Sequence, residues 1–157
     1  MITGLSHSEV FALDQDRAKA FYTEKLGLEV RNDFSMGDGF EGGGAGFRWL
    51  TVGIPGHPQP EIILADCAMG HDPETAEQLW SLVAKGVFGC GVLMTDDCRR
   101  THEELSSRGV VFLQEPAERP YGIEAVFRDD SGNWFSLTQP RWMAAADASR
   151  PAAGATA

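Results

Sequence analysis

The stretch that decides the fold is HSEVFALDQDRAKAFYTEKLG, residues 7–27, because its hydrophobic pattern changes period once. The first part is mostly apolar and suits a β-strand, whereas the second part places apolar residues at helical spacing. Asp14 or Asp16 can cap the helix, and Gly27 supplies a left-handed stop. The stretch therefore predicts a strand, a helix and then a second strand over LEVRNDF, residues 28–34.

Two more strands complete the first half of the chain. FRWLTV (47–52) and EIILA (61–65) are rich in β-formers, and the turn GIPGHPQP (53–60) joins them as a hairpin. The first half is therefore predicted as a βαβββ module over about residues 5–66.

The same order of elements returns in the second half. CGVLMTDDCRRTHEELSSRGVVFL (90–113) again gives strand, aspartate cap, helix, glycine and strand. The interval from Asp96 to Gly109 equals that from Asp14 to Gly27. Two further strand candidates follow the second helix: EAVFRD (124–129) and WFSLTQ (134–139). A second βαβββ module over about 88–140 is therefore predicted, and the fold class is α+β.

A linker helix is predicted between the modules, over about residues 72–85. Asp72 is placed to cap it, and Pro73 suits its first position. Residues 1–142 are expected to form a single domain. The tail, residues 143–157, has few large apolar residues and is predicted to be flexible.

Composition narrows the possible functions. The chain has 157 residues, of which 43% are hydrophobic and 23% charged, and no apolar run is long enough to span a bilayer. We therefore expect a cytoplasmic protein that does not associate with membranes. The three cysteines include no CxxC pair, which favours reduced thiols. A net charge of -10 opposes nucleic-acid binding and favours cationic or neutral ligands.

The motifs D-x-D-x-A-x-x-F-Y-x-x-x-L-G, from Asp14, and D-x-x-G-N, from Asp129, occur within the two modules. In this combination the chain resembles the vicinal oxygen chelate superfamily, which includes glyoxalase I, fosfomycin and bleomycin resistance proteins and extradiol dioxygenases. The resemblance implies that each module curls its sheet into a half-barrel and that two modules enclose a cleft. It also implies a symmetric homodimer, each cleft combining module one of one chain with module two of the other. A monomer with its edge shielded by the helix around Trp80 is the competing possibility.

The resemblance also assigns four positions that bind metal in some relatives. They are His7, Glu61, Cys90 (or Gly89, by the alternative count) and Ser136. His7 and Glu61 are good ligands, but serine is a poor one, and a catalytic site needs about three. A zinc, iron or manganese site would require Cys90 as a thiolate beside His7 and Glu61. That alternative would make the protein a metal-dependent lyase, isomerase or dioxygenase, with Glu61 able to act as base.

Aromatic residues suggest a different use of the cleft. Strand alternation places Phe47 with Trp49 on one face, and Trp134 with Ser136 on another. Such rings suit stacking on a planar ligand. The predicted ligand-binding residues are His7, Glu9, Phe11, Phe47, Trp49, Glu61, Cys90, Trp134 and Ser136.

The favoured hypothesis is a binding protein of the bleomycin resistance kind, without a cofactor. It would sequester a planar or aromatic antibiotic or related natural product, for example one with a quinone or other fused-ring portion, in a cleft at the dimer interface. Sequestration would lower the free concentration of the compound and confer self-resistance.

Overall fold

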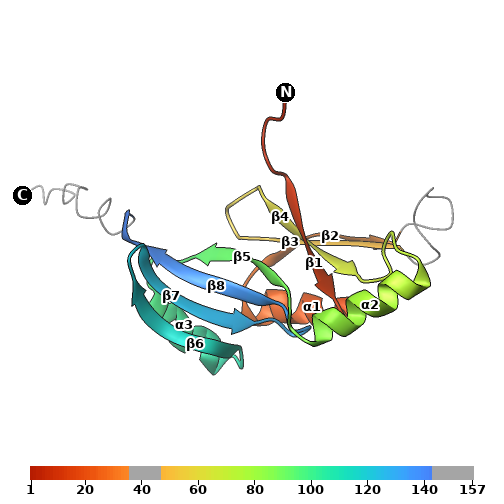
Figure 1. The fold of residues 1–157 in the computed structure, drawn as a ribbon. Helices are drawn as coiled ribbons and strands as arrows, with labels where there is room; N and C mark the ends of the chain where they lie inside the picture. The colour runs from red at the N-terminus through yellow and green to blue at the C-terminus, as the bar shows by residue number, and fades with distance from the viewer. Residues whose placement is uncertain (36–46, 143–157) are drawn as a thin grey trace, which may run out of the picture. The chain divides into compact units, whose positions relative to one another are not determined.

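The structure is a computed structural model that describes residues 1–35 and 47–142 (Figure 1). The first module contains β1 (His7–Ala12), α1 (Gln15–Ala20), the π-helical turn η1 (Phe21–Lys25), β2 (Glu29–Ser35), β3 (Arg48–Gly53) and β4 (Glu61–Asp66). The linker helix α2 spans Pro73–Ala84. The second module contains β5 (Gly89–Met94), α3 (Cys98–Ser107), β6 (Val111–Arg119), β7 (Gly122–Arg128) and β8 (Trp134–Pro140). The predicted α+β class with two βαβββ modules is confirmed, whereas the predicted flexible tail lies outside the described residues.

The chain divides into two compact units whose boundary differs slightly from that of the modules. The first unit contains Met1–Cys90 together with Arg128–Trp134, and the second contains Gly91–Phe127 and continues from Phe135. The turn between β7 and β8 thus belongs to the first unit, although the second module supplies it. Within the described residues, no helix is long and apolar enough to cross a bilayer.

The first sheet has the strand order β1-β4-β3-β2, with β1 parallel to β4. Alternation along β1 sets its two faces: Val10 and Ala12 are buried, while Glu9 is exposed. The register pairs His7 with Glu61. The sheet therefore carries these two predicted site residues on neighbouring strands.

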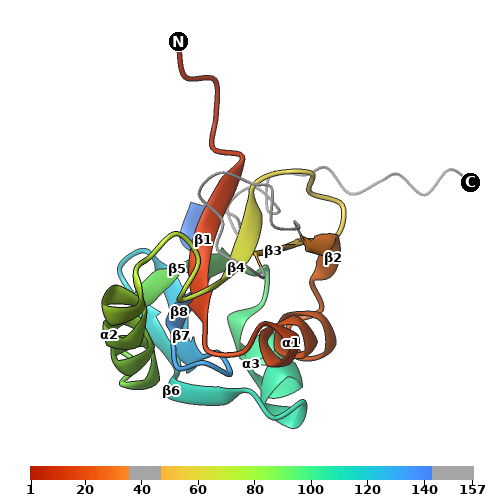
Figure 2. The same ribbon diagram turned by 90° about the vertical axis from the view of Figure 1, so that its right-hand side faces the viewer.

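Helix α1 covers the buried face of this sheet and contacts β4 (Figure 2). Its N-cap is Asp14, whose carboxylate accepts the backbone N–H of Arg17 at 2.9 Å. The N-cap of α3 is Asp97, one residue later than the predicted Asp96. The π-helical turn η1 explains the offset, because such a turn absorbs one additional residue between the cap and the glycine stop.

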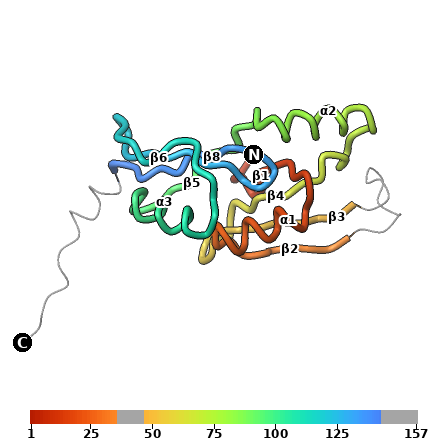
Figure 3. The backbone as a smooth tube through the Cα atoms, turned by 90° about the horizontal axis from the view of Figure 1, so that it is seen from below, coloured from red at the N-terminus to blue at the C-terminus, as the bar shows by residue number. Residues whose placement is uncertain are grey.

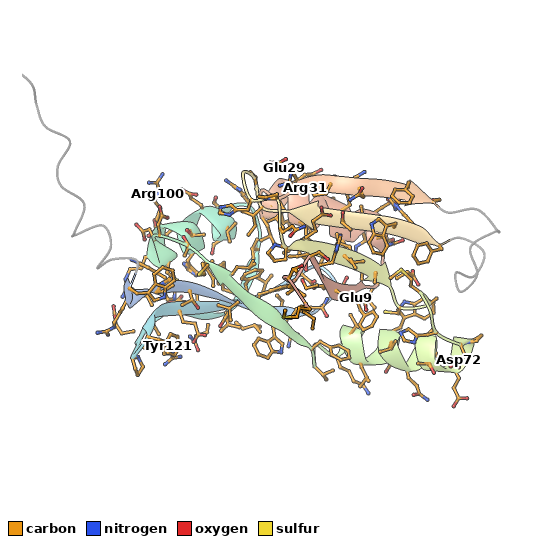
Figure 4. The ribbon with its side chains drawn as sticks, turned by 90° about the horizontal axis from the view of Figure 1, so that it is seen from above. Glu9, Glu29, Arg31, Asp72, Arg100 and Tyr121 are labelled. Carbon is orange, nitrogen blue, oxygen red and sulfur yellow. The ribbon has the colours of Figure 1, made fainter. Side chains whose placement is uncertain are left out.

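Helix α2 begins as predicted. Asp72 accepts hydrogen bonds from the backbone N–H groups of Glu74 and Thr75, and Pro73 occupies the first turn. Figure 4 shows Asp72 at the N-terminal end of this helix. Ala76 and Val83 form part of its buried side.

The second sheet has the order β5-β8-β7-β6, and α3 contacts β6 (Figure 3). Phe127 packs between Phe112 and Phe135, with ring centroids 5.7 and 5.6 Å away. Strand β6 extends to Arg119, well beyond the predicted end at Leu113. It passes through Pro116, which an edge strand tolerates because one side of its backbone needs no partner.

The turn between β7 and β8 is organised by a buried carboxylate. Asp129 Oδ1 accepts the backbone N–H groups of Ser131, Gly132 and Asn133 at 3.0, 2.9 and 2.9 Å. Asp129 Oδ2 accepts hydrogen bonds from the Tyr22 hydroxyl and the Asn133 side-chain amide, both at 2.8 Å. Burial, followed by the proximity of Asp129, raises the pKa of Tyr22 well above its ordinary value. The phenol therefore acts as a donor to Asp129.

The same turn is attached to β1 and to α2. Asn133 Nδ2 donates to the carbonyl of Phe11 at 2.8 Å, and the backbone N–H of Leu13 donates to Ser131 Oγ at 3.1 Å. Gly132 has a φ of +112°, and a Cβ there would lie 2.7 Å from the carbonyl oxygen of Val83. Only glycine satisfies both constraints without a local shift. The D-x-x-G-N motif thus holds the turn against the first sheet.

Asp130, the neighbouring acid, has a different environment. Among the described residues no donor reaches its buried Oδ1, and Oδ2 accepts only a 3.4 Å hydrogen bond from Ser131. Burial, then the negative charge of Asp129, raises the pKa of Asp130 to about 6, although the cationic Arg17 opposes the shift. Ionised Asp130 therefore destabilises the folded state.

We predict that Tyr22→Phe lowers the free energy of unfolding by about 1–2 kcal/mol, because it removes a hydrogen bond to a buried carboxylate. Urea denaturation of the wild type and the variant measures this change. Tyr121→Phe is the matched control, since its hydroxyl also donates to a carboxylate, Glu124, but the side chain is exposed. Equal effects at the two positions would contradict the role given to Asp129.

We also predict that Asp130→Asn stabilises the protein in a pH-dependent way. Because the folded pKa of about 6 lies above the ordinary value of 3.8, the wild type gains stability from this group as the pH falls through 6. The variant should exceed the wild type by roughly 1–2 kcal/mol at a mildly alkaline pH, after a discount for partial solvent screening. The difference should vanish near the unfolded pKa. Denaturation series across this range test it, and a constant difference would contradict it.

Candidate functional site

Glu61, at the start of β4, is the centre of a polar cluster on the first sheet. Its Oε2 accepts hydrogen bonds from the Thr51 hydroxyl at 2.6 Å and from the Asn32 amide at 3.2 Å. Asn32 also donates to Thr51 Oγ1 at 3.0 Å. His7 Nε2 lies 3.6 Å from the same Glu61 oxygen. The Glu61 carboxylate on β4 is thus held in a defined orientation by side chains from β2 and β3, with His7 of the parallel strand β1 beside it.

Sequence reasoning did not identify Thr51 and Asn32. Thr51 lies two residues from Trp49 on β3, so alternation alone could have placed it on the same face. Asn32 could not be placed in this way, because β2 changes register between Val30 and Asn32. The shift pairs Asn32 with Thr51.

Aromatic side chains lie next to this cluster. Trp49 contacts His7 edge-on, with ring centroids 5.7 Å apart and planes at 64°. Phe47 stacks on Trp49 at 6.3 Å and 24°. The predicted common face of Phe47 and Trp49 is confirmed, and His7 connects these rings to Glu61.

A second aromatic group lies along β1. Phe11 contacts Phe88 at 6.2 Å and His71 at 6.1 Å between ring centroids. Glu9 lies between His7 and Phe11 on the same side of the strand and is exposed; Figure 4 labels its position. We call this side of the first sheet the open face. It comprises His7, Glu9, Phe11, Asn32, Phe34, Trp49, Thr51, Glu61 and Ile63.

The structure does not bring Cys90 into the His7–Glu61 cluster. Burial, then the charge of Asp129, raises the pKa of the Cys90 thiol to about 11, so the thiol is protonated at neutral pH in the structure described. In the described part of the chain, no group of three or more His, Cys, Asp or Glu side chains is placed to hold a metal ion. Glu61 Oε2 already accepts two hydrogen bonds. This donor set fits a hydrogen-bonding site better than the alternative metal site of His7, Glu61 and Cys90.

Trp134, at the start of β8, lies against Gly89. A Cβ on Gly89 would collide with the indole ring, so the ring approaches the backbone at a position that only glycine allows without a local shift. The backbone N–H of Trp134 donates to the Phe88 carbonyl at 3.0 Å. Trp134 is thus fixed in the first unit, beside the backbone of the Phe88 residue that contacts Phe11.

Ser136 belongs to a separate network in the second unit. Its hydroxyl donates to Glu124 Oε1, while Glu124 Oε2 accepts from Tyr121 at 2.9 Å and from Arg119 at 3.4 Å. These donors, Ser136 first, lower the pKa of Glu124. Glu124 is a second carboxylate that sequence reasoning missed. Both of its oxygens have protein donors.

The sequence of the chain is similar to that of known proteins. A model of the Glyoxalase/Bleomycin resistance protein/Dioxygenase superfamily matches residues 4–137. The uncharacterized protein YetH of Bacillus subtilis (strain 168) is 30% identical over 139 residues, which are 88% of this chain and 100% of YetH.

Two solved structures are also similar. The crystal structure of UcmS2 is 51% identical with a TM-score of 0.80, over 88% of this chain and 99% of UcmS2. TnmS3, an antibiotic binding protein from Streptomyces sp. CB03234, is 29% identical with a TM-score of 0.67, over 88% of this chain and 97% of TnmS3. With the family match covering both modules, the chain belongs to the glyoxalase/bleomycin resistance protein/dioxygenase superfamily.

Proposed function

We propose that the protein binds a small planar antibiotic or related natural product on the open face and acts by sequestering it. The observation that carries this proposal is the position of the stacked Phe47 and Trp49 rings beside the fixed His7–Glu61 pair. Flat aromatic surface supplies affinity, and a few fixed polar atoms supply orientation.

The similarity to TnmS3 supports the same function. TnmS3 is an antibiotic binding protein, and the similarity spans 88% of this chain and 97% of TnmS3. Fold similarity alone would not transfer a function, since this superfamily also contains enzymes. The aromatic and acidic character of the open face is therefore the stronger support.

The proposed binding site is completed by a second copy of the chain. In the second unit, large apolar side chains are exposed on the strands: Val92 (63%), Met94 (63%), Val111 (65%) and Leu113 (50%). An exposed apolar surface formed by several large side chains favours burial against a partner. The symmetric dimer is the commonest assembly that buries such a surface. Each cleft would then combine the open face of one chain with the second module of the other.

The binding proposal is tested by tryptophan fluorescence during titration with a panel of planar aromatic natural products. We expect saturable quenching by at least one compound, and Trp49→Phe should weaken its binding roughly tenfold through lost stacking area. Trp80→Phe is the control, because Trp80 lies on α2 and is exposed. Absence of saturable quenching across the panel, or equal losses in both variants, would overturn the proposal.

The dimer is tested by light scattering at micromolar concentration. A particle of about twice the chain mass of 17.0 kDa is expected. Leu113→Glu should shift the particle toward the monomer, because it places a charge in the proposed interface. Val87→Glu, at an exposed apolar residue of the first unit, serves as the control. A wild-type particle near 17.0 kDa would refute the dimer.

A further inference from the structure

The two oxygens of Glu61 are used differently. Oε2 accepts hydrogen bonds from Thr51 and Asn32, whereas Oε1 accepts none from the residues that the structure describes. The side chain is 18% exposed, so the carboxylate as a whole is partly shielded from water. A carboxylate oxygen in such surroundings is a strong acceptor that gains from a donor brought by a ligand.

Glu61 is also held in place before any ligand arrives. Thr51 is fully buried, and Asn32 donates to both Thr51 and Glu61. An acceptor fixed in this way loses little conformational entropy on binding, which increases its contribution to affinity and specificity.

The nearby arginines are engaged elsewhere. Arg48 pairs with Asp33 and Asp16, at 2.8 and 2.7 Å, although its neighbour Trp49 is on the open face. Arg31 donates to the carbonyls of Ile54 and His57. Among the described residues Glu9 has no ion-pair partner, so it adds a further negative charge to the open face.

The second unit provides an internal comparison. Glu124 has Ser136, Tyr121 and Arg119 as donors, so its charge is largely compensated. Glu61 has no arginine or lysine partner among the described residues. The contrast marks Glu61 as the carboxylate that is available to a ligand.

We infer that the open face selects planar ligands that carry an N–H or O–H donor on the ring edge, which binds Glu61 Oε1 while the ring stacks near Trp49. It discriminates against the same ring carrying a carboxylate, because Glu61 and Glu9 would repel that charge. This inference rests on the proposed function and specifies the chemical class of its ligand.

Three probes of one ring system test the selection: an aminoanthraquinone, its N,N-dimethyl derivative and the anthraquinone carboxylate, each substituted at the same ring position. Fluorescence titration of the full-length wild type should show the amino probe binding roughly tenfold more tightly than the dimethyl probe. The carboxylate should bind most weakly. The dimethyl probe retains the ring and the neutral charge but has no N–H donor.

Glu61→Gln provides the decisive variant. Thr51 and Asn32 both donate to the Oε2 position, so they should hold the amide oxygen of the new side chain there. Its NH₂ group would then replace the Oε1 acceptor with a donor. The preference for the amino over the dimethyl probe should disappear, and binding of the carboxylate should improve. Glu77→Gln, an exposed position on α2, is the matched control and should retain the wild-type order.

The outcomes separate this inference from the proposed function. Binding of all three probes with equal affinity, unchanged by Glu61→Gln, would overturn the selection by Glu61 and leave planar-ligand binding intact. If none of the probes binds the wild type while a compound of the natural-product panel does, the inference for this ring class is wrong. If nothing in either set binds, both proposals are wrong. Circular dichroism of the Glu61→Gln protein checks that it folds.

Discussion

The buried carboxylate of Asp129 is the interaction on which the first unit depends. Taking a carboxylate out of water is costly, and here three backbone N–H groups, the Tyr22 hydroxyl and the Asn133 amide compensate it. The donors come from the turn itself and from the π-helical turn after α1. Through Asn133 the same network reaches the carbonyl of Phe11 on β1. The strand that presents His7, Glu9 and Phe11 is therefore fixed by a residue more than 100 positions away in the sequence.

The two sheets treat their carboxylates in opposite ways. Both oxygens of Glu124 accept hydrogen bonds from protein donors, including Arg119. Glu124 therefore stabilises the second sheet. Glu61 is oriented through one oxygen and leaves the other without a described partner. The two modules share one order of elements, so the backbone pattern does not determine this difference. It arises because Tyr121 and Arg119 donate to the second oxygen of Glu124, whereas no described side chain donates to the second oxygen of Glu61.

Local chemistry explains what could be predicted from the sequence. The caps at Asp14 and Asp72 depend on backbone N–H groups two or three residues away, and the common face of Phe47 and Trp49 depends only on alternation. Non-local features could not be obtained in this way. The register change in β2 moves Asn32 beside Thr51, and a π-helical turn shifts the first helix relative to the second. These depend on the partner strand or on tertiary packing, which override local propensity. Spacing along the chain likewise could not show that Cys90 is surrounded by groups that raise the pKa of its thiol.

The environment of Glu61 suits the proposed hydrogen-bonding role better than a metal site. A metal-bound carboxylate is stabilised by the charge of the ion, whereas Glu61 is stabilised by the hydroxyl of Thr51 and the amide of Asn32. Neutral donors fix the orientation of the carboxylate without cancelling its charge. The remaining negative charge lies beside aromatic rings that resist hydration, where electrostatic interactions are stronger than in water. Such a surface needs no catalytic group to hold a planar donor-bearing molecule, since stacking and one charge-assisted hydrogen bond account for both affinity and orientation.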